Sequence, residues 1–324
     1  MDRSSPVRRL RQAVAAFARE HLGDADRWCV ALSGGADSLA LTAAAADVLP
    51  TTALIVDHGL QAGSAAVATS AQRQAIQLGC VGAQIIPVVV GVDGGPEAAA
   101  RSARYAALES ARSGAPVLIG HTLDDQAETV LLGLGRGSGP RSIAGIRPYD
   151  PPWCRPLLEI RRTVTEAACV ALELDPWRDP HNHDPRFTRT RLRHEVLPLL
   201  EEVLGGGVAE ALARTATALQ EDGDVLDDLA ARALAEAGGA AADSPGLAVA
   251  AVLGLPRAVR LRVIRGWLLA GGARNLTSKQ IRGVDELASA WRGQGGVAVG
   301  GGRAGARLFA QRRDGVLVLR HEQR

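Results

Sequence analysis

Short apolar runs alternate with helical stretches through the first part of the chain, and this alternation limits the possible folds most strongly. The runs are typical of strands and cover 28–32, 53–57, 84–90 and 117–120. The stretches with helical patterns cover 6–22, 38–49, 62–78, 96–113 and 122–134. Strands that are apolar on both faces and are joined by helices are typical of parallel sheets covered on both sides. We therefore expect an α/β fold with a doubly wound parallel sheet.

The pattern changes in the second part of the chain. A helix predicted over 161–174 is followed by an irregular segment, then by helical patterns to about residue 287 and by short β-rich runs at the end. At 324 residues the chain is also longer than the ~150 residues of an average domain. We place a boundary at the glycines 205–207. The prediction is a first domain over 1–204 and a smaller, mainly helical domain over 205–324 with a terminal β-ribbon.

Composition excludes several classes of protein. The four cysteines are scattered and form no C-x-x-C pair, which argues against a disulfide scaffold, a structural zinc site and an iron–sulfur cluster. No apolar stretch approaches the ~20 residues of a membrane span, and the N-terminus lacks the apolar core of a signal peptide. We therefore expect a soluble cytoplasmic protein with no membrane partner. A net charge of +2 and 3% aromatic residues argue against a general RNA-binding protein.

Two phosphate-binding patterns can be rejected from their context. A Walker P-loop needs a lysine after its glycines, and the single lysine of the chain, Lys279, lies in LTSKQ without them. A G-x-G-x-x-G string occurs at Gly300, Gly302 and Gly305. It precedes a β-like segment and leaves too few residues for a βαβ unit. We expect these three glycines to form a turn.

A third glycine pattern, SGGADS, lies between a predicted strand and a predicted helix. Its members are Ser33, Gly34, Gly35, Ala36, Asp37 and Ser38. Glycines let the backbone turn sharply toward a ligand, and a helix start presents free N–H groups and the positive end of its dipole. The pattern predicts a phosphate cradle that needs no lysine, with Asp37 as the contact for a divalent cation. The alternative is a plain turn in which Ser or Asp caps the helix.

Acidic residues gather in the first turns of the helix predicted over 122–134. Asp124, Asp125 and Glu128 lie at i, i+1 and i+4, so Asp124 shares a face with Glu128, and Asp125 is also its neighbour. Such a cluster can hold an ammonium group and take its proton. The alternative is structural, because Thr122 and Asp125 match a T-x-x-D capping box.

Histidines and arginines supply further candidates. His58 and His121 follow predicted strands, at the edge of the sheet where ligands of open α/β folds collect, although each is equally consistent with a structural role. The segment 186–193 carries four arginines that could contact a nucleic-acid backbone. A second candidate patch has a spacing that a solvated helix face would also show, and consists of Arg257, Arg260, Arg262 and Arg265.

The hexapeptide 33–38 resembles the SGGxDS motif of the PP-loop, or N-type, ATP pyrophosphatases, and the rest of the chain is similar to the tRNA(Ile)-lysidine synthetases among them. The resemblance covers roughly residues 28–200. The motifs that carry it, in order, are Val56-Asp57-His58-Gly59-Leu60; Glu97, Ala100-Arg101 and Arg104-Tyr105; the block 120–129; 136–139; 155–158; and a spaced set that runs from Trp177 to Arg193 and Pro198. His181 and Thr190 depart from the family pattern and put local loop contacts in doubt.

The resemblance implies a PP-loop ATPase fold, similar to the adenine nucleotide alpha hydrolases, in the domain 1–204, a tRNA-binding domain over 205–324, and the activity of a carbon–nitrogen ligase. It implies that ATP, with Mg²⁺ at Asp37, adenylates the C2 oxygen of the wobble cytidine in tRNA(Ile) with a CAU anticodon, and that L-lysine then displaces AMP. Residues 33–38, Val56, His58 and His121 are implied to bind the nucleotide. Roles in the reaction are implied for five residues, which are Asp37, Arg101 (or Arg104), Asp125, Glu128 and Arg193.

Two other functions remain as alternatives at this stage. One is another PP-loop tRNA-modifying enzyme such as a thiolase, although thiolases that resemble the cytidine enzymes carry C-x-x-C pairs and this chain has none. The other is a non-catalytic nucleotide-binding protein, which would need neither the acidic helix nor an arginine-rich second domain. The oligomeric state is left open, with a homodimer as one option.

Overall fold

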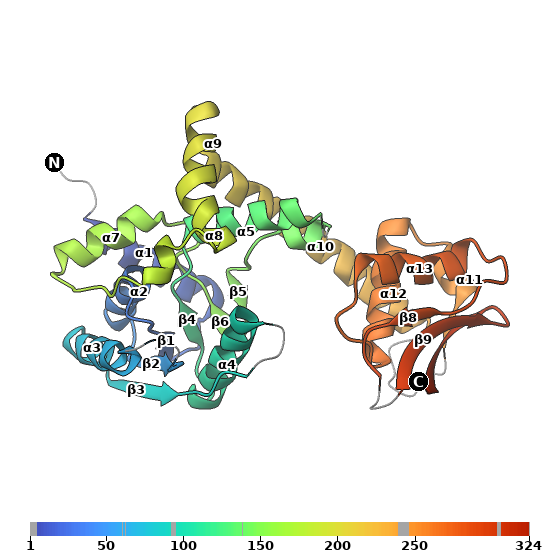
Figure 1. Cartoon of the computed structure of the whole chain (residues 1–324), viewed down its shortest axis with the longest axis horizontal. Coiled ribbons are helices and arrows are strands. Elements are labelled where there is room, and N and C mark those ends of the chain that lie inside the picture. Colours follow the sequence, from blue (N-terminus) through green and yellow to red (C-terminus); the bar gives the residue numbers. More distant parts are fainter. Residues whose placement is uncertain are drawn as a thin grey trace. The chain divides into compact units, whose positions relative to one another are not determined.

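A mainly parallel sheet forms the centre of the larger part of the computed structural model (Figure 1). Its strands are β1 Trp28–Ala31, β2 Thr51–Asp57, β3 Gly82–Pro87, β4 Val117–Ile119, β5 Tyr149–Asp150 and β6 Trp153–Cys154. They lie in the order β3-β2-β1-β4-β6-β5, and every neighbouring pair is parallel except β5 and β6. The predicted α/β fold is confirmed. The short β5–β6 hairpin is an addition that the sequence pattern does not predict.

The structure describes residues 5–59, 61, 63–91, 95–137, 139–238, 246–302 and 306–323. The chain divides into two compact units, which are Met1–Arg136 with Ile143–Ala216, and Gly137–Ser142 with Thr217–Arg324. The division falls inside helix α10, Val208–Glu236, which belongs to both units. The glycines 205–207, where we place the boundary from the sequence, lie just before this helix.

Helices cover both faces of the sheet in the larger unit. The helices of this unit are α1 Pro6–His21, α2 Ala36–Ala46, α3 Ser64–Gln77, α4 Pro96–Ala111, α5 Leu123–Arg136, α7 Arg162–Ala171, α8 Thr188–Arg191 and α9 Leu197–Val203, with the 3₁₀-helix η1 Pro180–His183 and the π-helix η2 Leu192–Val196. The short helix α6, Pro140–Ile143, belongs mostly to the smaller unit. Helices α1, α2 and α7 pack on one another, and their side chains share one core with β1. Leu108 of α4 packs with Cys29, Leu54 and Val117 in a separate core. The fold is therefore doubly wound, as expected.

The strands pack tightly because they are apolar on both faces. Val30 of β1 pairs with Ala53 of β2 on one side and with Leu118 of β4 on the other, and all three side chains are fully buried. Trp28 is also buried, and its indole Nε1–H donates a hydrogen bond to Thr51 Oγ1 at 2.7 Å. A buried tryptophan needs such a partner for its one donor.

The smaller unit combines helices with an antiparallel sheet. Its further helices are α11 Val249–Leu253, α12 Arg257–Ala270 and α13 Ser278–Ser289, and its strands are β7 Leu247–Ala248, β8 Val297–Val299, β9 Ala306–Arg313 and β10 Val316–Gln323. The strand order is β7-β10-β9-β8, so the predicted terminal β-ribbon is part of a four-stranded sheet. Trp267 of α12 is buried in the core of this unit. Among the described helices of the chain, none has the length and hydropathy that crossing a membrane requires.

The G-x-G-x-x-G string in the smaller unit serves packing. A Cβ atom on Gly300 would lie 1.9 Å from the carbonyl oxygen of Arg274, and Gly301 forms a β-bridge with Ala273. The backbone therefore passes too close to its neighbour for any side chain. Gly305 lies outside the described residues. A Cβ atom on Gly302 would lie 2.7 Å from the carbonyl oxygen of Ala306. Close backbone approach therefore explains the first two glycines of the string without a phosphate.

Gly120 joins the end of β4 to the start of α2 by a similar close approach. A Cβ atom at this position would lie 3.1 Å from the carbonyl carbon and oxygen of Asp37 and 3.2 Å from Ser38 Cα. All three are backbone atoms, so they have little freedom to move away. Gly120 therefore sets the spacing between two loops at the carboxyl edge of the sheet.

We predict that Gly120→Ala lowers the free energy of unfolding by about 1–3 kcal/mol, because the added methyl group overpacks this contact. Urea denaturation followed by circular dichroism measures the change. Gly23→Ala is the matched control, since no heavy atom lies within 4 Å of its Cβ position. Equal stability of the two variants would contradict the proposed packing constraint.

Candidate functional site

A cavity of about 1140 Å³ opens at the carboxyl ends of the parallel strands. The loops that follow β1, β2 and β4 line it with Ser33, His58 and His121, and α5, α7 and η2 add Asp125, Arg162 and Arg193. Strand β1 lies between β2 and β4, where the chain order of the strands reverses, and open α/β sheets bind ligands at this point. This volume is slightly above the usual range for ligand sites, so the cavity has room for more than one small substrate.

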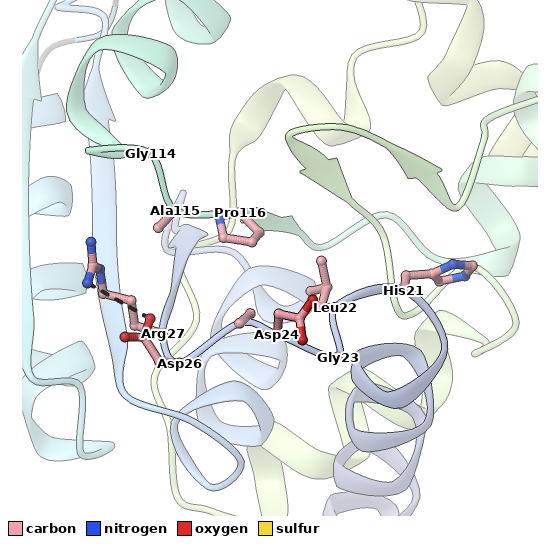
Figure 2. A pocket seen from close by; sticks show the side chains of 10 residues that line it. His21, Leu22, Gly23, Asp24, Asp26, Arg27, Gly114, Ala115 and Pro116 are labelled. Atoms are coloured by element: carbon pink, nitrogen blue, oxygen red, sulfur yellow. Dashed lines mark ion pairs between the residues drawn. The ribbon is translucent and has the colours of Figure 1, made fainter.

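A second cavity of about 350 Å³ lies at the amino ends of strands β1 and β4, opposite to the large cavity (Figure 2). Its wall consists of the loop 21–27 before β1 and the segment 114–116 before β4. Figure 2 shows the Asp26–Arg27 ion pair at its rim, with a 3.9 Å separation between the charged atoms. Because this cavity faces the amino ends of the strands, it does not share the topology of a nucleotide site.

The hexapeptide 33–38 forms an open loop that leads into α2. Gly34 has a φ of +85°, and its carbonyl oxygen accepts a hydrogen bond from the Trp177 N–H at 2.9 Å. The Ser38 hydroxyl donates to the Gly35 carbonyl at 2.9 Å, and the Ser33 N–H donates to the Ser38 hydroxyl at 3.2 Å. Gly35, and neither serine nor aspartate, is the N-cap of α2, and no side chain caps the helix. The capping alternative is therefore wrong, and the helix start has N–H groups available for an anion.

Asp37 lies in the first turn of α2, where its carboxylate faces α7. Its Oδ2 accepts a hydrogen bond from Arg162 Nε at 2.9 Å, and its Oδ1 accepts one from the Thr165 hydroxyl. Burial raises the pKa of Asp37 above its usual range, and the charge of Arg162 and the Thr165 bond only partly offset this effect. Within the described residues, no group of three or more His, Cys, Asp and Glu side chains is arranged to hold a metal ion. Each oxygen of Asp37 accepts one hydrogen bond and keeps a second lone pair, so this carboxylate fits as one ligand of a magnesium ion that takes its remaining ligands from phosphate and water.

Asp125 and Glu128 form a buried acidic pair on α5. Asp125 Oδ2 accepts hydrogen bonds from the Thr122 N–H and hydroxyl, both at 2.8 Å, so the predicted capping contact is present. Asp125 Oδ1 instead points toward Arg162 and Arg193. The side chain of Glu128 is fully buried. One carboxylate therefore caps the helix and also contributes to the charged site.

Two arginines from separate helices neutralise these acids. Arg162, the first residue of α7, lies 2.9 Å from both Asp37 Oδ2 and Asp125 Oδ1, and its Nη1 lies 3.7 Å from Glu128 Oε1. Arg193 lies on η2, and its Nε and Nη2 contact the two oxygens of Glu128 at 2.7 and 3.1 Å. π-Helical turns are frequent at functional sites. The result is a cluster of three carboxylates and two guanidinium groups, which we call the charge cluster.

The two acids of the pair respond differently to their surroundings. Burial is the largest influence on Asp125 and raises its pKa, but Arg162, His121, the Thr122 N–H and Arg193 outweigh it and leave this pKa below the usual value. Burial of Glu128 dominates over its contacts with Arg193, and its pKa is raised. Asp125 is therefore the more firmly ionised of the two, and Glu128 accepts a proton more readily.

A cationic region also lines the large cavity. Arg104 of α4 lies over the ring of Tyr105, with 5.8 Å between its Cζ and the ring centre. Among the residues that the structure describes, no carboxylate forms an ion pair with it. Burial lowers the pKa of His121 to about 4, and burial and Arg104 lower that of His58. The Nδ1 atoms of both histidines are buried and have no hydrogen-bond partner in the described structure. This region offers a cation and two neutral imidazoles to a ligand.

The structure brings most of the candidate residues to the large cavity. The candidates that line it are Ser33, Gly35, Ala36, Asp37, Ser38, Val56, His58, His121, Asp125 and Arg193. Glu128 lies behind them against Arg193, and Gly34 forms the turn without lining the cavity. Arg101 is exposed and donates to the Tyr105 hydroxyl at 3.3 Å, whereas Arg104 lines the cavity. Asp124 turns toward α7, where its Oδ2 accepts the Arg162 N–H at 2.7 Å.

The two arginine patches are partly engaged by acids. In the segment 186–193, Arg186 pairs with Asp184 at 2.6 Å and Arg191 pairs with Glu195 at 2.8 Å. On α12 the ion pairs are Arg257 and Arg260 with Asp285, and Arg262 with Asp227. These α12 pairs hold α12 to α13 and to α10, so they have a structural role within the smaller unit.

Some motif residues of the sequence cannot be placed. Leu60 and Ser138 lie outside the described residues, as do the side chains of Glu97 and His181. Thr190 lies on the short helix α8 and is partly buried.

Arg162 is the member of the charge cluster that the motif search does not find. A signal for it exists, because Arg161 and Arg162 stand at the start of α7, whose first turn contains no acid. The positive end of a helix dipole disfavours cations, so two arginines at this place need acidic partners from elsewhere. Arg161 forms ion pairs with Asp124 at 3.2 Å and Glu210 at 3.0 Å. Arg162 forms ion pairs with Asp37 and Asp125 of the charge cluster.

Two known domain families and several known proteins are similar to this chain. Residues 6–200 match the PP-loop domain, and residues 247–315 match the TilS substrate binding domain. The chain is 70% identical over 322 residues to the tRNA(Ile)-lysidine synthase of Mycobacterium bovis, and these residues cover 99% of each chain. It is 60% identical over 317 residues to that of Nocardia farcinica, covering 97% of this chain and 98% of the relative.

Among solved structures, the chain is similar to the U34-tRNA thiolase NcsA from Methanococcus maripaludis, a structure that contains a [4Fe-4S] cluster. The TM-score is 0.53 at 19% identity, over 67% of this chain and 80% of that one. At this identity the similarity shows a shared fold and nothing about activity.

We predict that His121 makes the stability of the protein depend on pH. Its pKa is about 4 in the folded chain and about 6.5 when unfolded, so between these values the unfolded chain binds more protons and stability falls as the pH is lowered. The loss from this residue is about 1–2 kcal/mol between pH 7 and pH 5. Urea titrations at both pH values measure it.

His121→Asn should lose less stability on acidification than the wild type, because asparagine does not titrate. His321→Asn, at an exposed position on β10, is the control and should keep the wild-type dependence. If His121→Asn followed the wild-type dependence as well, the neutral buried imidazole would be excluded.

Proposed function

The chain belongs to the tRNA(Ile)-lysidine synthase family, and from this premise we propose how its own residues join L-lysine to tRNA(Ile). The match to synthases extends over nearly the whole chain, so the enzyme uses ATP to attach lysine to this tRNA. The observation that carries our proposal is that one cavity contains both an anion cradle and an acidic pair. The first suits the phosphates of ATP, and the second suits the ammonium group of lysine.

The loop 33–38 would hold the nucleotide. Backbone N–H groups at the start of α2 face the cavity, and Ser33 and Ser38 add hydroxyl groups. Asp37 is the residue of this chain that would hold Mg²⁺ against the phosphates. When bound, the ion would neutralise charge on the phosphate oxygens and so favour loss of pyrophosphate. The residues around Asp37 keep its carboxylate oriented toward the cavity.

Activation of the base must precede the attack of lysine. The C2 oxygen of cytidine cannot leave directly, whereas an adenylated oxygen can leave as part of AMP. The ε-amine of lysine then forms a bond to C2 of the wobble cytidine in the CAU anticodon, the C2–O bond breaks, and the amine loses a proton. The protein must therefore bind lysine as a cation and also remove a proton from it.

The acidic pair can serve both purposes. Arg162, Arg193 and the Thr122 N–H favour the ionised form of Asp125, so we assign it to binding the ammonium. Glu128 has a raised pKa and is fully buried, so we assign it to receiving the proton. A base with a pKa closer to the working pH takes up and releases a proton more easily. Arg193 contacts both acids and would keep them in place.

Arg104, in place of Arg101, is our candidate for the charge that develops on the α-phosphate. Arg104 lines the cavity beside the two neutral histidines, and within the described structure no carboxylate competes for it. A buried cation without an acid nearby favours the arrival of an anion. Arg101 lies on the exposed side of the same helix.

The other functions considered from the sequence are not favoured. The relatives that match 97–99% of this chain are lysidine synthases. The buried cysteines are Cys29, Cys80, Cys154 and Cys169, and they belong to the packed cores. We retain the cytoplasm as the proposed location and leave the oligomeric state open, with a homodimer as one option.

Incorporation of labelled lysine into RNA tests the proposed function. We expect purified protein with ATP, Mg²⁺, labelled L-lysine and a CAU-anticodon tRNA(Ile) transcript to transfer label to the tRNA. A folded enzyme that transfers none would refute the proposal. A transcript with a different wobble base is the substrate control and should remain unlabelled.

Two acid variants separate the steps of the reaction. Asp37→Ala should abolish pyrophosphate release, because it removes the contact beside the phosphate loop. Glu128→Gln should retain pyrophosphate release and slow lysine transfer roughly 100-fold, which is typical for loss of a proton acceptor. Glu195→Gln, an exposed acid on η2 that pairs with Arg191, is the matched control. If both site variants fail equally at pyrophosphate release, the assigned division of roles is wrong.

A comparison of Arg104→Ala with Arg101→Ala tests the assignment on α4. We expect Arg104→Ala to slow pyrophosphate release roughly 100-fold, the usual loss for a group that stabilises developing charge. Arg101→Ala should slow pyrophosphate release by at most about tenfold, because the Arg101 side chain lies outside the cavity. Single-turnover measurement of pyrophosphate gives both rates, and the reverse order of effects would assign the role to Arg101.

A further inference from the structure

Arg162 connects two parts of the site that the proposed function assigns to different substrates. Its Nε bonds to Asp37 beside the phosphate loop, and its Nη2 bonds to Asp125 of the acidic pair, both at 2.9 Å. Its side chain is 17% exposed and lines the cavity, so a ligand can reach it. One guanidinium group therefore spans the place of the nucleotide and the place of the lysine.

The acidic pair offers an ammonium group no accessible acceptor in this arrangement. Both hydrogen bonds from Thr122 go to Asp125 Oδ2, and Arg162 and Arg193 contact Asp125 Oδ1 at 2.9 and 3.4 Å. The two oxygens of Glu128 bond to Arg193, and its side chain is fully buried, so a ligand cannot reach them past the guanidinium groups. An ammonium has three donors and needs these same acceptors. A guanidinium group must therefore move before lysine can bind.

The contacts indicate which of the two arginines moves. Arg193 forms a bidentate contact with Glu128 through two hydrogen bonds, a geometry that binds a carboxylate strongly. Arg162 divides its bonds between two carboxylates on different helices and makes only a 3.7 Å contact with Glu128. It is also the arginine next to the phosphate loop. A polyphosphate on that loop would add negative charge on the Asp37 side of Arg162 and none on the Asp125 side.

We propose that Arg162 is a placeholder that occupies the ammonium position on Asp125 until a nucleotide draws it toward the phosphate loop. This inference rests on the proposed function, since it takes ATP and lysine as the two ligands. Arg162 is then a positioning residue that makes the two sites interdependent. Bound nucleotide frees Asp125 Oδ1, so ATP increases the affinity for lysine and, by linkage, lysine increases the affinity for ATP.

The surrounding structure permits a movement of the side chain alone. The Arg162 N–H donates to Asp124 Oδ2 at 2.7 Å, which holds the backbone at the start of α7 in place. The Thr165 hydroxyl, one turn later, bonds to Asp37 independently of the guanidinium group. The long side chain of Arg162 can therefore turn from Asp125 toward the loop while the helix remains fixed.

Equilibrium dialysis with labelled L-lysine tests this proposal on the full chain. Lysine affinity is measured with Mg²⁺ alone, and again with Mg²⁺ and α,β-methylene-ATP, which cannot be cleaved between its α and β phosphates. For the wild type we expect the nucleotide to tighten lysine binding roughly tenfold, within the usual range for coupled sites. Nucleotide affinity, measured separately with and without lysine, should change by the same factor.

Two substitutions examine Arg162 itself. Arg162→Ala should reduce the coupling to less than about twofold, because the lysine position is then unoccupied with or without nucleotide. Arg162→Lys keeps the charge but cannot bond to Asp37 and Asp125 together, and should restore about threefold coupling. If Arg162→Ala lost the coupling only through poorer packing, the Arg162→Lys variant would not restore part of it. Thermal unfolding of each variant confirms that it is folded.

Arg161→Ala is the matched control. It removes the same charge from the neighbouring position, but its partners are Asp124, Glu201 and Glu210, outside the charge cluster. It should keep the wild-type coupling.

The proposal is overturned if the wild type shows no coupling, if Arg162→Ala retains it, or if Arg161→Ala loses it to the same extent. Each of these results leaves lysine incorporation into tRNA intact and so leaves the proposed function standing. Absence of both lysine binding and lysine incorporation would instead reject the function together with the placeholder. The two failures are therefore distinguishable.

Discussion

Charge balance within a partly buried cluster is the constraint on which the site depends. Asp37, Asp125 and Glu128 have side-chain exposures of 21%, 12% and 0%, and buried carboxylates so close together are costly unless cations accompany them. Arg162 and Arg193 supply two positive charges for three negative ones. The cluster is thus stable without a ligand and still retains an excess of negative charge. That excess suits a cationic amino acid, which the site must both bind and deprotonate.

The topology of the sheet determines why these groups meet. Parallel strands β1 and β4 end at the same edge, so the loop that begins α2 and the loop that begins α5 lie side by side, and Gly120 sets their spacing. Helix α7 packs against α2 and brings Arg162 to Asp37, while η2 packs against α5 and brings Arg193 to Glu128. Each acid therefore comes from the sheet edge, and each arginine comes from a later helix that closes over it.

The sequence predicts the elements well and the long-range contacts poorly, for physical reasons. The strands 28–32, 53–57 and 117–120 are evident because burial makes them apolar on both faces. Strand β3 lies at the edge of the sheet and is only partly buried, and β5 and β6 have two residues each and no pattern. The capping contact of Asp125 can be predicted, because its partner Thr122 is only three residues away. Its partners Arg162 and Arg193 lie 37 and 68 residues away, and no local rule selects them from the arginines of the chain. Arg101 and Arg104 look alike in sequence, and only the direction in which α4 faces separates them.

A crystal structure of the protein with α,β-methylene-ATP, Mg²⁺ and L-lysine tests the central claim most directly. The account predicts the phosphates on the loop 33–38, the lysine ε-nitrogen within about 3.2 Å of the carboxylates of Asp125 and Glu128, a hydrogen-bond distance, and Arg162 turned away from Asp125. Lysine bound elsewhere, with both arginines still on the acidic pair, would show that the cluster is a structural ion-pair network and would contradict the account.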